Sequence, residues 1–506
     1  MYDKKYKTWR LEDLPMVPKH LKTIVIQKTG KQFNTVKHLL TRNDVKDIII
    51  ATDAGREGEL VARWIIEKAR VKKPVKRLWI SSVTDKAIRD GFKNLQPGKK
   101  YENLYASAVA RAEADWYVGL NATRALTTKY NAQLSSGRVQ TPTLGIIATR
   151  EKEIREFRPQ TYYGLEMKTQ TGTTFTWQDR KNNTRIFDKE KAEKLRAKLN
   201  KKQATIISVE KKDKKQFAAQ LYDLTELQRD ANRMFNFSGK QTLNAMQNLY
   251  ERHKVLTYPR TDSRVITTDI VPTLKDRLDA CGVDEYAGLA RKLAKKNFKL
   301  PKSVVNNAQV SDHHAIIPTE QSVDLEALGS NERKIYDLVV KRFLAVLSDP
   351  YEYEEVRVTA EVEGERFTAR GNNVKKLGWK EVYERDTSAS QEDRLHPYKV
   401  GASIQNASVR VTEGETKPPE RFTEGALLKA MENPAKYMAA DEKHLAKTLH
   451  QAGGIGTVAT RADIIDKLID GQYMELRGKY LYLTQTGKQL LELAPEDLRS
   501  PALTAE

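Results

Sequence analysis

The sequence predicts a multidomain protein that combines an α/β domain with helical and β-rich α+β domains. A chain of 506 residues is too long for a single hydrophobic core. Its N-terminal part alternates short apolar runs with amphipathic helical stretches, whereas residues 160–215 and 341–412 are rich in Thr, Val, Tyr and Glu in short alternating runs. These patterns indicate one α/β domain and one β-rich arch that the chain visits twice.

The α/β domain is predicted within residues 1–98. An apolar strand over 45–51 precedes an amphipathic helix over 57–69, a second strand over 75–80 and a helix that Thr84 caps. Helices that alternate with strands in this way favour a partly parallel sheet.

Helical patterns fill most of the remaining chain. Residues 99–159 predict a first helical segment that forms a separate layer, and residues 216–340 predict a helical domain inserted between the two visits to the arch. Residues 413–506 predict a second helical segment. This part ends in a hairpin over 473–483 with Gly478 at its turn, an arrangement typical of a winged helix.

The charge balance predicts a nucleic-acid partner. Lys and Arg total 88 against 67 for Asp and Glu, and the resulting net charge of +21 suits a protein that binds a phosphate backbone. Charge alone leaves two alternatives open: a basic protein with a solvated surface, and an RNA-binding protein of the ribosome.

The composition also limits where the protein works and what it contains. No apolar run is long enough to cross a bilayer and no secretory signal is evident, so we expect a cytoplasmic, nucleoid-associated monomer without membrane contact. The single Cys281 excludes an internal disulfide and a Cys-based zinc ribbon within these residues.

An acidic loop follows the first predicted strand. Residues 48–52 lead into Asp53-Ala54-Gly55-Arg56-Glu57-Gly58-Glu59 and then a helix, which puts carboxylates at the C-terminal edge of the sheet. Hard oxygen ligands on a tight turn suit Mg²⁺, so Asp53 and Glu57 are the predicted metal ligands. In the alternative interpretation, Glu57 and Glu59 only oppose the dipole at a helix N-terminus.

A tyrosine on a turn is the candidate nucleophile. Ser238 and Gln241 predict the start of a helix that runs to about residue 251, and the chain then turns through Tyr258-Pro259-Arg260. A phenol presented in this way can attack a phosphodiester while Arg260 neutralises the developing charge. A Tyr packed beside a turn Pro is the structural alternative.

Further strings predict contacts with phosphate and bases. A helical stretch with a basic face and an aromatic ring can contact the DNA backbone and stack on a base. A Ser-Ser-Gly-Arg string has free backbone N–H groups that can hold a phosphate. The candidates from these two features and from the Gly-rich string 454–462 are Arg111, Trp116, Arg124, Ser135, Ser136, Gly137, Arg138, Val139, Gln140 and Arg461. Each Arg or Trp taken singly fits a solvated face or a core position equally well. No nucleotide-binding loop is evident, because no Lys-Ser/Thr pair follows the Gly-rich string.

The string Ser311-Asp312-His313-His314-Ala315-Ile316-Ile317-Pro318-Thr319 carries two adjacent histidines. Adjacent side chains point in different directions, and no Cys or third His lies nearby in the sequence, so zinc is not expected. A structural histidine is the alternative to a functional one.

Several strings resemble those of a known family. The acidic loop resembles the Toprim signature, and Tyr-Pro-Arg-Thr-Asp-Ser resembles the active-site motif of type IA DNA topoisomerases. The sequences of these motifs and their order along the chain resemble those of the topoisomerase III group. The same is true of the segments 311–319, 417–425 and 454–462. This resemblance implies four domains that form a torus.

The resemblance also implies an activity. Tyr258 attacks one strand of single-stranded or underwound DNA and keeps its 5′-phosphate, another strand passes through, and the break is resealed without ATP. Arg260, His313 and Glu57 are implied as catalytic residues, with Mg²⁺ on Asp53 and Glu57. Relaxation of negative supercoils, decatenation, a part in DNA recombination and a helicase partner belong to the same expectation.

The chain departs from the family pattern in two places. Gly55 stands where many members have a second Asp, which favours one metal ion over two. No Glu-Lys-Pro-Ser type segment is found near the start, so the first Toprim strand and its catalytic Glu are predicted to be missing. With both ends abrupt in sequence, we expect a fragment that binds DNA but cleaves it poorly.

Two other classes of protein remain as alternatives. A tyrosine recombinase or type IB enzyme attaches the opposite DNA end and needs no metal, but its His-x-x-Arg upstream of Tyr is not evident. A non-catalytic winged-helix DNA-binding protein needs none of the catalytic residues.

Overall fold

The computed structural model describes residues 8–383, 394–405 and 407–505. The parts of the predicted domains at 1–7, 384–393, 406 and 506 lie outside the described residues. The chain divides into two compact units, and each is described here by itself. The first comprises Met1–Lys152, Gln220–Val340 and Arg421–Glu506, and the second comprises Glu153–Ala219 and Lys341–Glu420.

The first unit begins with the predicted α/β region. Its elements are α1 (Gly30–Thr41), β1 (Ile48–Ile50), α2 (Arg56–Ala69), β2 (Val75–Arg77), α3 (Asp85–Lys93) and β3 (Gln96–Pro97). The sheet has the order β1-β2-β3, with β1 parallel and β3 antiparallel to β2. Thr84 caps α3 by accepting a hydrogen bond from the Ala87 N–H at 3.2 Å. The predicted alternation is confirmed, although both main strands are shorter than expected. Within the described residues 8–47 the structure contains no strand.

Two helices continue this unit, and α4 packs against α2. They are α4 (Glu102–Tyr130) and α5 (Gln140–Glu156), and the break between them falls where the Ser-Ser-Gly string lies. The inserted segment adds α7 (Leu224–Phe235), α8 (Gly239–Glu251), α9 (Leu274–Cys281), α10 (Ala287–Ala294) and α11 (Ser330–Leu347). Ser238 caps α8 by accepting from the Gln241 N–H at 2.9 Å, as predicted.

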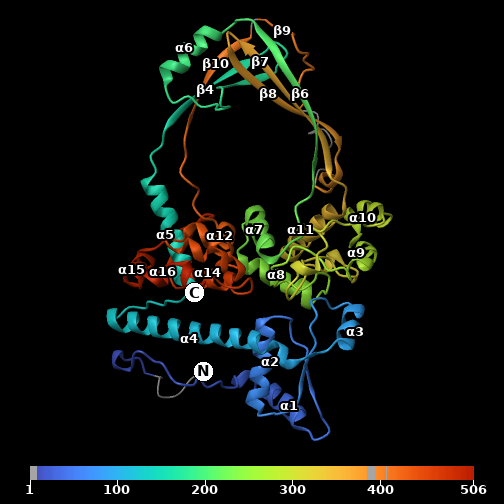
Figure 1. Ribbon diagram of the computed structural model, residues 1–506, viewed down its shortest axis with the longest axis vertical. Coiled ribbons are helices and arrows are strands. Elements are labelled where there is room, and N and C mark those ends of the chain that lie inside the picture. The colour runs from blue at the N-terminus through green and yellow to red at the C-terminus, as the bar shows by residue number, and fades with distance from the viewer. Residues whose placement is uncertain (1–7, 384–393, 406, 506) are drawn as a thin grey trace. The chain divides into compact units, whose positions relative to one another are not determined.

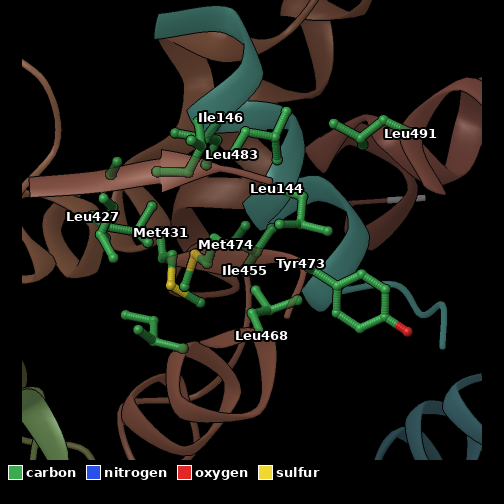
Figure 2. Close-up of a cluster of buried hydrophobic side chains, with 14 of the residues drawn as sticks. Leu144, Ile146, Leu427, Met431, Ile455, Leu468, Tyr473, Met474, Leu483 and Leu491 are labelled. Atoms are coloured by element: carbon green, nitrogen blue, oxygen red, sulfur yellow. The ribbon is translucent and has the colours of Figure 1, made fainter. Parts of the chain in front are cut away.

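The C-terminal segment shares a core with α5. Its elements are α12 (Glu424–Glu432), α13 (Ala446–Gln451), α14 (Arg461–Asp470), β11 (Met474–Arg477), β12 (Tyr480–Leu483), α15 (Gln485–Leu493) and α16 (Glu496–Arg499). Figure 2 shows Leu144 and Ile146 of α5 among Met431, Leu468 and their neighbours, all buried. Burial of this apolar surface joins two segments far apart in sequence. The β11–β12 hairpin turns at Gly478 with φ 62°, as predicted.

The second unit is built on a seven-stranded sheet. Its elements are β4 (Thr161–Lys168), β5 (Thr174–Gln178), α6 (Lys189–Leu199), β6 (Ala204–Gln216), β7 (Tyr351–Val362), β8 (Glu365–Lys376), β9 (Ser403–Ile404) and β10 (Ser408–Glu415). The strand order is β10-β4-β5-β8-β7-β6-β9, so strands from both visits share one antiparallel sheet. Figure 1 shows green β6 beside orange β7.

Candidate active site

The acidic loop turns tightly between β1 and α2. The Gly55 N–H donates to the Asp53 carbonyl at 2.9 Å, and a Cβ atom on Gly58 would lie 2.0 Å from that same carbonyl oxygen. Gly58 is therefore required by a close backbone approach. The turn leaves the Asp53 side chain 58% exposed and leaves Glu57 exposed at the start of α2.

Glu59, in contrast, has a structural role. Its fully buried carboxylate accepts from Arg77 Nε at 2.6 Å and from Arg63 Nε at 3.1 Å. The buried Arg77 guanidinium also donates to the carbonyls of Thr52 at 2.7 Å and Ile50 at 3.2 Å. This network fixes the end of β1 and the loop that follows it. No sequence signal pointed to Arg77, because its partners lie on separate elements.

Tyr258 lies between two other rings. Its ring centroid is 4.1 Å from that of His313 and 5.4 Å from that of Tyr250, which it meets edge to face. The Thr257 N–H donates to the Ile317 carbonyl at 3.0 Å and holds the turn against the 311–319 string. Burial and then the nearby Asp53 charge raise the pKa of Tyr258, so the phenol is protonated in this form.

His313 connects the tyrosine to the acidic loop. Its Nε2 lies 3.5 Å from Oδ2 of Asp53, and this hydrogen bond lowers the pKa of the Asp53 carboxyl. His314 points elsewhere: it is buried, and its Nδ1 lies 2.7 Å from the Ala315 carbonyl. The adjacent histidines therefore face in different directions, as predicted. Arg260 is exposed, and its charge acts on Tyr258 by lowering the phenol pKa.

Asp312 is a carboxylate at this site that sequence reasoning missed. A Cβ atom on Gly55 would lie 2.2 Å from Oδ2 and 2.3 Å from Oδ1 of Asp312. Burial is the largest cause that raises the pKa of Asp312, to about 6; the charge of His313 opposes this rise, and Asp262 and Asp53 contribute to it. In its string Asp312 is only a neighbour of the two histidines, and its contact with Gly55 depends on how distant segments pack.

Basic side chains lie beside the acidic loop. Arg111 of α4 is half-buried, and burial followed by repulsion from Arg56 lowers its pKa, with Arg138 adding to the effect. Arg138 is held by Asp115, with Nη2 2.6 Å from Oδ1. Trp116 is half-buried and meets the ring of Tyr117 edge to face.

The Ser-Ser-Gly string differs from the prediction in one respect. We expected free backbone N–H groups there, but those of Ser135, Ser136 and Gly137 are bonded to side-chain hydroxyls of Tyr473, Thr123 and Thr141 at 2.7, 3.0 and 3.0 Å. Tyr473 carries its hydroxyl out of the hydrophobic cluster toward this string (Figure 2). The string is thus positioned by the C-terminal core and does not offer these donors to phosphate. Val139 and Gln140 are half-buried at its end.

Two arginines predicted to contact DNA are buried. Arg461 is 3% exposed and donates to the carbonyls of Gly453, Ile455 and Gly456. Arg124 is 5% exposed, beside Met16 and the ring of Trp9. The guanidinium of Arg461 closes the Gly-rich loop. The burial of Arg461 and Arg124 does not favour the predicted direct contact of these side chains with phosphate.

The donor set at the loop fits a hard divalent cation. Asp53 and Glu57 both present accessible carboxylates, and within the described parts of the chain Glu57 makes no hydrogen bond or ion pair. Mg²⁺ prefers a few carboxylates with water and substrate phosphate over a closed protein cage. The described residues contain no group of three or more His, Cys, Asp or Glu side chains that could hold a metal ion.

Comparison with known proteins decides the family. The sequence profile of the DNA topoisomerase family matches residues 99–506, and that of the Toprim domain matches residues 6–83. The whole chain is 60% identical to DNA topoisomerase 3 of Bacillus licheniformis and 58% identical to that of Bacillus subtilis, and it covers 70% of each of these relatives. The chain belongs to the type IA DNA topoisomerases.

Membership extends to the topoisomerase 3 group. The DNA topoisomerase 3 of Bacillus anthracis, 59% identical over the whole chain, supports the same grouping. This topoisomerase is an isomerase of DNA topology, and the alternatives of a recombinase, a type IB enzyme or a non-catalytic binding protein no longer apply. A solved structure, topoisomerase I from Thermotoga maritima, shares the fold with a TM-score of 0.71 at 24% identity, covering 95% of this chain and 76% of that one. Among the described residues, no helix is long and apolar enough to span a membrane.

Proposed function

We propose that Tyr258 is the nucleophile of this topoisomerase and forms a transient 5′-phosphotyrosine with one DNA strand. The observation that carries the proposal is the contact chain from Tyr258 through His313 to Asp53, which joins a phenol on a turn to the acidic loop. The phenol is half-buried, and within the described residues its Oη makes no hydrogen bond, so the oxygen remains available for attack.

The proposed chemistry conserves bond energy. The Tyr258 oxygen attacks the phosphorus and loses its proton, the bond from phosphorus to the 3′-oxygen breaks, and that oxygen takes up a proton. The exposed Arg260 stabilises negative charge on the phosphoryl group, and His313 orients the phenol. In resealing, the freed 3′-hydroxyl attacks the phosphotyrosine, so ATP is not required.

Asp53 and Glu57 hold Mg²⁺ in this proposal, with Glu57 close to the reacting phosphate as a catalytic residue. The metal, when bound, supplies Lewis-acid stabilisation of the phosphate charge. The chain's own contribution is to keep two accessible carboxylates at fixed spacing on a turn that Gly58 and Arg77 hold rigid.

The substrate of this proposal is single-stranded or underwound DNA. Arg111, Arg138 and Trp116 are the side chains we assign to backbone contact and stacking. Strand passage in a ring of domains, relaxation of negative supercoils, decatenation and cooperation with a helicase follow from the family grouping and belong to the same proposal.

A denaturing-gel adduct assay tests the nucleophile. Single-stranded DNA labelled at its 3′ end is incubated with this chain and with its Tyr258→Phe variant, with and without Mg²⁺. We expect a labelled covalent adduct that Tyr258→Phe abolishes, because the 5′-phosphate fragment carries the label. An adduct that persists in Tyr258→Phe, or that forms only with 5′-labelled DNA, would overturn the assignment, as would DNA binding by this chain without any adduct.

A further inference from the structure

A second ring of the inserted segment, besides that of His313, contacts the ring of Tyr258. We propose that Tyr250 is a positioning residue for the nucleophile and that its ring, together with that of His313, fixes the direction of the Tyr258 phenol. The proposal rests on the role of Tyr258 in the proposed function. It adds a residue of α8 that acts through the phenol and not through DNA.

The geometry of the ring contacts is the first observation that supports this. The ring centroids of Tyr250 and Tyr258 lie 5.4 Å apart with their planes at 80°, the edge-to-face arrangement that aromatic pairs prefer. The ring of His313 lies 4.1 Å from that of Tyr258 at an angle of 37°. Because an edge-to-face contact depends on the angle between the planes, it restrains rotation of the phenol ring.

The backbone of the nucleophile is fixed by groups other than its ring. The Thr257 N–H donates to the Ile317 carbonyl at 3.0 Å, and the Thr257 hydroxyl accepts from the Ile317 N–H at 3.0 Å. These bonds hold the turn but leave the side chain of Tyr258 free to rotate. Among the residues that the structure describes, the phenol oxygen makes no hydrogen bond. The direction of the phenol is therefore set by its ring contacts.

The end of α8 that carries Tyr250 is held firmly. Leu249, next to it, is fully buried. The Asn248 amide donates to Oε1 of Glu332 at 3.1 Å, and Nε2 of His253 lies 2.9 Å from Oε2 of the same carboxylate. A side chain on a helix that is tied down in this way holds its neighbour more precisely than a side chain on a loop.

The ring of Tyr250 makes this contact, and its hydroxyl does not contribute to it. The side chain is 36% exposed, and within residues 8–383, 394–405 and 407–505 its hydroxyl makes no hydrogen bond. The attraction of an aromatic pair comes from the rings, so Phe at this position keeps it, whereas Leu is apolar and has no ring. These two substitutions therefore separate positioning by the ring from a role of the hydroxyl.

Single-turnover cleavage tests the consequence for the reaction. The parent chain, Tyr250→Phe and Tyr250→Leu react with saturating 3′-labelled single-stranded DNA and Mg²⁺, and fluorescence anisotropy gives the affinity of each for the same DNA. Tyr250→Leu should form the adduct about tenfold more slowly at unchanged affinity, and Tyr250→Phe should keep the parent rate. Phe187→Leu, which removes a 60% exposed ring of the second unit, is the control and should react as the parent chain does.

Fluorine NMR tests the ring contact without any cleavage. A 3-fluorotyrosine placed at position 258 reports the surroundings of that ring in the absence of DNA. Tyr250→Leu should shift its signal, because the magnetic field of the neighbouring ring is lost. Tyr250→Phe and Phe187→Leu should leave the signal in place. Circular dichroism checks that each variant is folded.

The outcomes separate this inference from the proposed function. If Tyr250→Leu reacts within about twofold of the parent chain, or if its fluorine signal does not move, Tyr250 does not position the phenol. An equal loss of rate in Tyr250→Phe would assign the effect to the hydroxyl, and weaker affinity at an unchanged single-turnover rate would make the ring a DNA contact. Either result overturns the inference alone. If the parent chain forms no adduct that depends on Tyr258, the proposed function fails and this inference fails with it.

Discussion

Nε2 of His313 lies 3.5 Å from the carboxylate of Asp53, two residues whose segments are far apart in sequence. The same imidazole contacts the ring of Tyr258 in a tilted arrangement, with the ring centroids 4.1 Å apart. A single side chain thus links the nucleophile to the metal-binding loop. The local sequence around each residue cannot encode this link, because it exists only when the inserted segment lies on the α/β region.

Replacing His313 should slow cleavage without unfolding the chain. We expect His313→Ala to lower the rate of adduct formation by about 100-fold, because the phenol loses the ring that orients it and Asp53 loses its partner. His444→Gln, at an exposed histidine in the C-terminal segment, serves as control and should keep the parent rate. A rate for His313→Ala within threefold of the parent would show that the contact has no role in catalysis.

The buried pair of Arg77 and Glu59 should be important for stability. Arg77→Met leaves the Glu59 carboxylate buried with only Arg63 as a partner, and we expect a loss of about 3–5 kcal/mol in unfolding free energy. Urea denaturation followed by circular dichroism measures it. Arg42→Gln, which breaks an exposed pair with Asp44, should leave the transition unchanged. Equal effects of the two substitutions would contradict the structural role of Arg77.

Local elements of the fold were predictable, and contacts between distant segments were not. Thr84, Ser238 and Gly478 act at caps and a turn where short-range chemistry decides, so their sequence signals were reliable. At the candidate site, sequence singled out Tyr258 and the loop because rare strings carry them, whereas the partners that surround them, such as Arg77, are defined only by packing.

The burial of charged groups could also not be predicted from the sequence. Asp312 and Arg461 look like ordinary polar residues in their strings, yet one packs against Gly55 and the other closes a loop with three carbonyl contacts. Both environments arise from tertiary contacts that local periodicity does not specify.

Glu424 should make stability depend on pH between about 4.5 and 7. Burial raises the pKa of its carboxyl to about 7, while its Oε1 accepts from the Gly239 N–H at 2.7 Å at the start of α8. The folded chain holds the Glu424 proton more tightly than the unfolded chain does. The protonated carboxyl therefore contributes to the free energy of unfolding, and this contribution is fully present below pH 4.5. It is lost as pH rises through 7, to a total of about 3 kcal/mol.

Glu424→Gln tests this dependence. Gln keeps an oxygen for the Gly239 N–H but does not titrate. The stability of the variant minus that of the parent should therefore be greater at pH 8 than at pH 5. Urea unfolding at both pH values gives the difference, and Glu496→Gln, at an exposed position of α16, should show none. A parent-minus-variant difference that is the same at both pH values would show that Glu424 is not the titrating group.

Arg138 and Arg461 should differ in how they affect DNA binding. If Arg138 contacts a phosphate, Arg138→Gln should reduce the slope of log affinity against log salt by about 0.7 for single-stranded DNA. Arg461→Gln should leave that slope unchanged and should lower stability, because the side chain satisfies backbone carbonyls of the Gly-rich loop. Fluorescence anisotropy with a labelled oligonucleotide over a salt series measures the slopes, and urea unfolding measures stability. Arg196→Gln, at a partly exposed position of α6, is the control for loss of one charge. A reduced slope for Arg461→Gln would show that its guanidinium leaves the loop to meet DNA, and an unchanged slope for Arg138→Gln would remove Arg138 from the DNA-binding surface.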